Sequence, residues 1–168
     1  MRPTILTSDN AKLSAEEAAT LAEFERRFSV VRKTYVQQSP TIKQKEFLDC
    51  TAFEALFGGA AGGGKSSALL MCALQYVHLP GYSSLILRRT YQDLALAGAI
   101  MSRSHEWLQG TDAKWDSVNK KWIFPSGSIL QFGYLESDQD RFRYQSAEFQ
   151  FCPSDDLTQS SQRQSRSL

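Results

Sequence analysis

The sequence has few cysteines, no long apolar run and no excess of charge of either sign. Its cysteines, Cys50, Cys72 and Cys152, fit neither a disulfide framework nor a metal-ligand pattern, and favour a reduced, intracellular compartment. We also expect no signal peptide and no membrane-spanning segment, because no apolar stretch is long enough. Nineteen basic and 18 acidic residues leave a net charge of +1, so nucleic acid could be contacted only through a local basic patch.

The 168 residues suffice for one domain, and a hydrophobic fraction of 42% is enough to give it a packed core. We expect an N-terminal helical segment and linker over residues 1–38, the main domain over 39–157 and a disordered polar tail over 158–168. In the first segment, apolar residues at three- and four-residue intervals predict a helix over 14–36. Basic residues off its apolar face form either a solvated side or a DNA-binding side.

One glycine-rich segment carries most of the information about chemistry. It reads Gly59-Ala60-Ala61-Gly62-Gly63-Gly64-Lys65-Ser66 and fits the phosphate-binding loop G-x-x-x-x-G-K-[ST]. The run 52–57 before it predicts a buried strand, and residues 67–77 after it predict a helix, which is the context that the motif requires. The alternative is a glycine-rich turn that binds nothing.

The loop predicts a site for a nucleotide with Mg²⁺. Its glycines let backbone N–H groups turn toward the β-phosphate, and the following helix N-terminus favours anions. Lys65 is expected to reach the β- and γ-phosphates, and Ser66 to help hold Mg²⁺. Ser67 completes the predicted nucleotide-binding set.

The rest of the main domain predicts an α/β fold. Residues 41–48 read as a short helix, and residues 84–87 form a second apolar run. Residues 92–108 read as a helix loosened by Gly98. Short strands at 114–116, 121–124 and 128–132 predict a β-hairpin, whose aromatic residues are either its core or a base-stacking platform. With a further strand at 149–152, we expect a P-loop NTPase three-layer core with a mainly parallel sheet, a β-hairpin insertion and an N-terminal helix.

Hydrolysis also needs a carboxylate near Mg²⁺ and a group that orients the attacking water. Asp155 and Asp156 follow the last apolar run, so we predict Asp155 as a metal ligand and Asp156 as the water-orienting group. The alternative is an ordinary loop or helix cap. Pro153, just before them, lacks a ladder donor and is unfavourable in a central strand.

Several motifs occur in an order typical of one family. They are Gln44, the stretch from Phe57-Gly58 through Lys65-Ser66, Leu87-Arg88-Arg89-Thr90-Tyr91, Phe124-Pro125-Ser126-Gly127, Arg143-Tyr144-Gln145 and Asp155-Asp156-Leu157-Thr158-Gln159. Together they resemble the N-terminal ATPase domain of tailed-phage terminase large subunits, the motors that package viral DNA. The similarity covers residues 41–159.

The resemblance implies an ATPase that moves double-stranded DNA into a capsid, with the portal protein and the small terminase subunit as partners. It implies a homo-oligomeric ring in the host cytoplasm. Gln44 matches the adenine-reading glutamine, with a surface glutamine as the alternative. Arg143, or Arg141, matches the arginine that reaches a neighbouring subunit's nucleotide, with an ordinary surface charge as the alternative. Arg88 and Arg89 either sense phosphate or DNA or form a structural ion pair.

The sequence departs from the family in two respects. The family strand is apolar and ends in Asp-Glu, whereas Asp156 is one methylene shorter than that glutamate and Pro153 interrupts the strand. The family's later coupling strands and nuclease domain have no counterpart, so we expect a truncated terminase without nuclease activity. The alternatives are a non-catalytic nucleotide-binding remnant of a terminase, or a helicase-like or recombinase-like ATPase.

Overall fold

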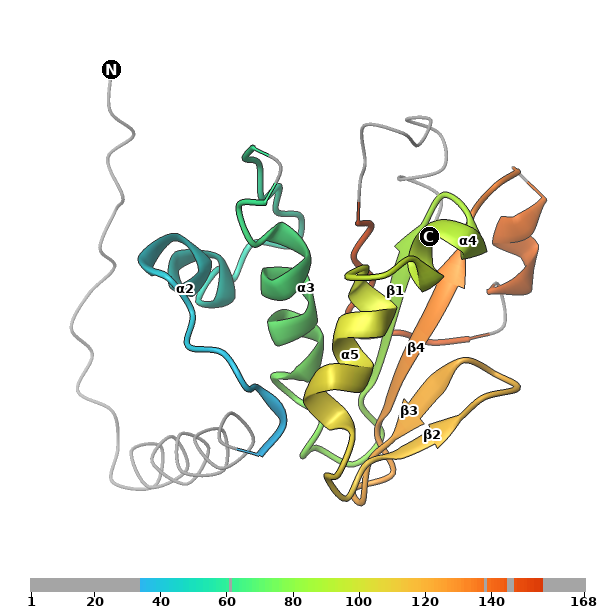
Figure 1. Ribbon diagram of the computed structural model, residues 1–168. Helices are drawn as coiled ribbons and strands as arrows, with labels where there is room; N and C mark the ends of the chain where they lie inside the picture. The colour runs from blue at the N-terminus through green and yellow to red at the C-terminus, as the bar shows by residue number, and fades with distance from the viewer. Residues whose placement is uncertain (1–33, 61, 138, 145–146, 156–168) are drawn as a thin grey trace.

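The computed structural model describes residues 34–60, 62–137, 139–144 and 147–155 (Figure 1). Ala61, Asp156 and the predicted tail therefore lie outside the described residues, as does nearly all of the helix predicted over 14–36.

The first complete helix is α2, Ile42–Leu48, as the sequence predicts for residues 41–48. It begins with a capping box in which the Thr41 hydroxyl accepts from the Gln44 backbone N–H, and the Gln44 side chain accepts from the Thr41 backbone N–H.

In the part of the chain that the structure describes, three further α-helices follow the glycine-rich loop. Helix α3, Lys65–Leu74, matches the helix predicted there, and seven of its ten residues are buried. The single helix predicted over 92–108 is wrong, because two helices occupy that stretch: α4, Tyr91–Ala95, and α5, Ile100–Leu108. Between them the backbone leaves the helical region at Leu96, and Gly98 adopts a φ of 74° that a helix cannot contain.

The four named strands form one mixed sheet in the order β1-β4-β3-β2. Their bounds are β1, Ser83–Arg88; β2, Lys114–Asp116; β3, Lys121–Ile123; and β4, Ile129–Tyr134. Strands β1 and β4 are parallel, with Arg88 opposite Tyr134, whereas β2–β3 and β3–β4 are antiparallel. The predicted β-hairpin is confirmed, but the expected mainly parallel sheet is not what these four strands form.

The strand predicted over residues 52–57 is not formed. The segment is exposed coil, with Phe53 fully exposed and the Leu56 side chain 80% exposed. A strand forms only beside a hydrogen-bonded neighbour. The edge of β1 that faces away from β4 is occupied instead by Phe151 and Ser154, which make isolated parallel bridges to β1. The prediction failed because apolar character alone does not supply a partner strand.

The core lies on both faces of β1. Ile86 packs with residues of α3, α4 and α5 in the larger cluster, and Figure 1 shows α3 and α5 beside β1. Leu85 and Leu87 point to the other face, where they pack with Leu135. That smaller cluster contains no residue from an α-helix, so the described residues give one helical layer on the sheet.

The aromatic residues of the hairpin belong to the core. Trp122, Phe124 and Phe132 are buried, and Trp115 is half-buried against them. The Trp122 indole N–H donates to the buried Ser104 hydroxyl of α5 at 3.0 Å. These contacts support the core interpretation over a base-stacking platform.

Candidate nucleotide-binding site

The glycine-rich loop joins the exposed segment 52–57 to the N-terminus of α3. Gly63 N–H donates to Ala60 O at 3.1 Å, which closes a turn inside the loop. Gly62 and Gly64 have φ values of 77° and 76°, in the left-handed region that favours glycine. Gly64 is also the residue that caps α3, so the loop enters the helix through a conformation that a side chain would strain.

Lys65, the first residue of α3, folds back over the loop. Its ammonium donates to Gly59 O and Ala60 O, each at 2.9 Å. These two carbonyls lie at the start of the loop, so the lysine links its two ends. The positive charge of Lys65 therefore lies beside the loop carbonyls. The motif predicts that this charge contacts the phosphates.

Ser66 and Asp155 meet although they are 89 residues apart in the sequence. The Ser66 hydroxyl lies 3.0 Å from Asp155 Oδ1 and 3.1 Å from Oδ2, and Asp155 is 4% exposed. The sequence assigns both residues to Mg²⁺, and the fold brings their oxygens together. A hydroxyl and a carboxylate are oxygen ligands of the kind that Mg²⁺ takes beside phosphate.

The backbone around Pro153 brings Asp155 to this position. Leu87 N–H donates to Pro153 O at 2.9 Å, and Asp155 N–H donates to Leu87 O at 2.8 Å. Pro153 itself has no N–H to donate, and the pairing with β1 consists of two isolated bridges. The predicted disturbance at Pro153 is therefore present, but Asp155 still reaches the carboxyl end of β1.

Gln44 contacts the loop through its side chain. Its amide nitrogen donates to Gly64 O at 2.8 Å, its amide oxygen accepts from Thr41 N–H, and the residue is 1% exposed. The surface-glutamine alternative is therefore wrong. Gln44 links α2 to the loop, and whether its amide also meets adenine stays a prediction.

The structure adds two arginines that sequence reasoning assigned weakly or missed. Arg88 forms the ion pair that was one of its alternatives, with Nε 3.2 Å from Asp155 Oδ2. Arg103, on α5, donates to the hydroxyl of the buried Ser67 at 2.6 Å. No local pattern marks Arg103, because its position depends on how α5 packs against α3. Both guanidiniums bring positive charge to the start of α3.

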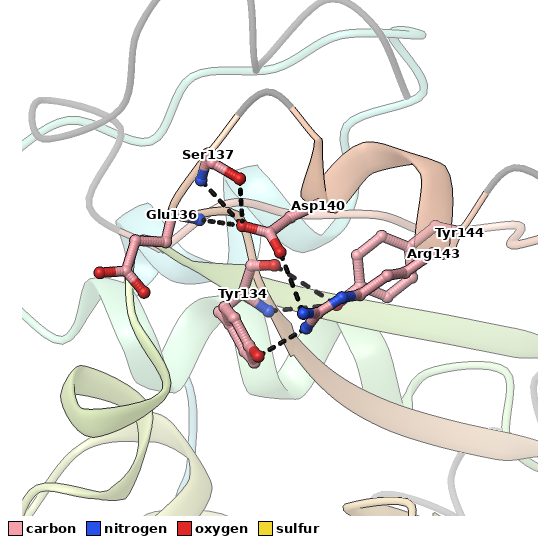
Figure 2. Close-up of polar contacts among 6 residues, drawn as sticks. All are labelled: Tyr134, Glu136, Ser137, Asp140, Arg143 and Tyr144. Carbon is pink, nitrogen blue, oxygen red and sulfur yellow. Dashed lines mark hydrogen bonds and ion pairs between the residues drawn. The ribbon is translucent and has the colours of Figure 1, made fainter.

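Arg143 belongs to a separate cluster of polar contacts, shown in Figure 2. Its guanidinium donates to the Tyr134 hydroxyl at 2.5 Å and lies 3.3 Å from Asp140 Oδ1, while its side chain is 54% exposed. The hydrogen bond to Tyr134 is the main cause that raises the pKa of Arg143 above its ordinary value. The backbone N–H of Ser137 is the main cause that lowers the pKa of Asp140.

This cluster lies on the same edge of the sheet as Asp155. Tyr134 ends β4 directly opposite Arg88, which ends β1, and neighbouring strands are about 5 Å apart. Open α/β sheets bind ligands at the carboxyl ends of their strands. Arg143 is thus on the expected edge but is held within its own chain, and its role toward a neighbouring subunit stays a prediction. The water-orienting role assigned to Asp156 lies outside the described residues.

Two negative findings concern metal cages and membranes. Within the ranges that the structure describes, no three His, Cys, Asp or Glu side chains gather in a group suited to a metal ion. None of the helices in those ranges is both long and apolar enough to cross a membrane.

Comparison with known proteins gave no further assignment: no family model matches the chain, and no curated protein or solved structure shows significant similarity to it.

Proposed function

We propose that the chain binds ATP with Mg²⁺ and is the ATPase portion of a phage terminase large subunit. The observation that carries the nucleotide part is the contact between Ser66 and Asp155 at 3.0 Å. It joins the phosphate-loop helix to the one described carboxylate that the sequence assigned to the metal. The packaging role rests on the ordered motifs, and so double-stranded DNA, the portal protein and the small terminase subunit belong to the proposal.

The chain's own groups are of the kinds that bind the phosphates and the Mg²⁺ ion of ATP. Lys65 offers a positive charge to the phosphates, and the loop offers backbone N–H groups. Ser66 and Asp155 would hold Mg²⁺, which when bound neutralises charge on the phosphate oxygens. Asp156 is the proposed group that orients water, and Arg143 is the proposed arginine for a neighbouring subunit in a homo-oligomeric ring.

Replacing Lys65 with alanine tests the nucleotide site. A hydrogen bond to a charged group contributes about 1.5–3 kcal/mol, so we expect ATP affinity with Mg²⁺ to fall by about 10- to 100-fold. Titration calorimetry measures the affinity, and phosphate release measures turnover. Lys114→Ala is the matched control, because Lys114 is an exposed lysine on β2. Equal affinity in the Lys65→Ala and Lys114→Ala variants would contradict the assignment.

A second candidate function is a nucleotide-binding protein without turnover. It is favoured by the interrupted pairing at Pro153, since a displacement of about 1 Å at a catalytic group can reduce the rate about 100-fold. ATP binding that depends on Lys65, without phosphate release, would support this candidate. Turnover stimulated by portal protein and small terminase subunit would instead support the packaging motor, and would also separate it from a helicase-like ATPase.

A further inference from the structure

The carboxylate of Asp155 lies between a hydroxyl and a guanidinium that come from different elements. Ser66, on α3, contacts both carboxylate oxygens, while Arg88, at the end of β1, places Nε 3.2 Å from Oδ2. The two charged side chains are only 15% and 5% exposed, so water screens their attraction weakly. A buried carboxylate needs such a partner, because removing one member of a buried pair leaves an uncompensated charge.

Arg88 has a second anchor away from the carboxylate. Its Nη1 donates to the backbone carbonyl of Asp93 in α4 at 2.5 Å. The guanidinium therefore keeps a hydrogen-bond partner if its contact with Asp155 is given up. Since both a guanidinium and Mg²⁺ bind a carboxylate through positive charge, the two compete electrostatically for Asp155.

We propose that Arg88 is a positioning residue that neutralises Asp155 while the site is empty and gives way to Mg²⁺ when nucleotide binds. This inference rests on the proposed function, since it assigns the same carboxylate to the metal. It has a consequence that a purely structural ion pair lacks. A chain without the Arg88 charge must depend more strongly on Mg²⁺ and nucleotide for its stability.

The test compares Arg88→Gln with Arg89→Gln in thermal unfolding. Arg89 is the adjacent, exposed arginine, so its variant controls for the loss of one positive charge at this edge. Each protein is measured alone, with Mg²⁺, and with Mg²⁺ plus adenylyl imidodiphosphate. Without nucleotide we expect the Arg88→Gln Tm to lie about 5–10 °C below that of Arg89→Gln. With Mg²⁺ and the analogue, we expect Arg88→Gln to gain about 5 °C more than wild type gains.

Two results would overturn parts of this reasoning separately. If Mg²⁺ and the analogue raise the Tm of Arg88→Gln only as much as that of the wild type, the proposed exchange of Arg88 for Mg²⁺ at Asp155 is overturned. The proposed function would be overturned as well if Mg²⁺ and the analogue did not raise the Tm of the wild type. It would also be overturned if they raised the Tm of Lys65→Ala as much as that of the wild type.

A double variant keeps the test decisive if Arg88→Gln folds poorly. Asp155→Asn removes the charge that Arg88 is proposed to neutralise. Arg88→Gln also loses the hydrogen bond to the Asp93 carbonyl, and that loss is the same in both backgrounds. We therefore expect Arg88→Gln to lower the stability less in the Asp155→Asn background than in the wild type, measured without nucleotide. An equal loss in the two backgrounds would show that Arg88 stabilises the fold through groups other than Asp155.

Discussion

Replacing Gly64 with alanine probes the junction between α2 and the glycine-rich loop. Gly64 has a φ of 76°, and a Cβ added there would lie 2.6 Å from the Gln44 amide nitrogen. That nitrogen now donates to Gly64 O, and the other end of the same amide completes the capping box with Thr41. Gln44 therefore cannot move away from the new methyl group without breaking at least one of these two hydrogen bonds.

The loss of stability follows from two contributions. A left-handed φ in an alanine costs about 1–2 kcal/mol, and an unsatisfied buried amide costs about 1–3 kcal/mol. We expect Gly64→Ala to lower the free energy of unfolding by about 2–4 kcal/mol, since the partner is displaced rather than removed. Urea unfolding followed by circular dichroism measures this free energy.

Two other glycines separate the contributions. Gly110 has a φ of 83° with nothing within 4 Å of its added Cβ, so Gly110→Ala should show only the backbone strain of about 1–2 kcal/mol. Gly58 has neither a left-handed φ nor a close neighbour, so Gly58→Ala should be nearly neutral. If Gly64→Ala costs no more than Gly110→Ala, the close contact with Gln44 is refuted. In a Gln44→Ala background, the extra loss at Gly64 should disappear.

Two further predictions concern the contacts between α5 and the hairpin. Trp122→Phe should lower the free energy of unfolding, measured in urea, by about 1–3 kcal/mol. The change removes the indole N–H that the buried Ser104 hydroxyl accepts from, and it leaves part of the volume of the indole ring empty. An unchanged free energy of unfolding would contradict that contact. Burial beside Trp115 and Trp122 lowers the pKa of His105 below its ordinary value of 6.5, so the unfolded chain binds the proton first as pH falls. The stability that neutral His105 contributes is therefore complete above pH 6.5 and decreases below it. His105→Gln should reduce this pH dependence of the free energy of unfolding, measured in urea. An identical pH profile in the variant would refute the role of His105.

The elements that sequence reasoning predicted correctly are those whose signals are local. The hairpin follows from short apolar strands flanking Pro125-Ser126-Gly127, and α2 follows from the helix-like run over residues 41–48. The strand over 52–57 has an equally apolar sequence, but a strand requires a partner, and partners are chosen by the whole sheet. The predicted helix over 92–108 is wrong for a local reason, because Gly98 takes a positive φ that a helix cannot contain.

The site shows the same division. The motif located the loop, Lys65 and Ser66 because their spacing is fixed within eight residues. The prediction of Asp155 depends on its position after the last apolar run, and the structure places its carboxylate beside Ser66. Arg103 was missed, and the partner of Arg88 was undecided, because each contact depends on packing between elements far apart in the sequence.

The two halves of the candidate site differ in how they are held. The loop half is fixed by contacts within one short region, from Lys65 to the loop carbonyls and from Gln44 to Gly64. The carboxylate half depends on a few backbone hydrogen bonds beside Pro153 and on the contacts of Asp155 with Ser66 and Arg88. Local contacts survive disturbance elsewhere in the fold better than an edge pairing with a missing donor. Nucleotide binding should therefore persist under mild destabilisation that already displaces Asp155, so turnover is the more fragile of the two proposed activities.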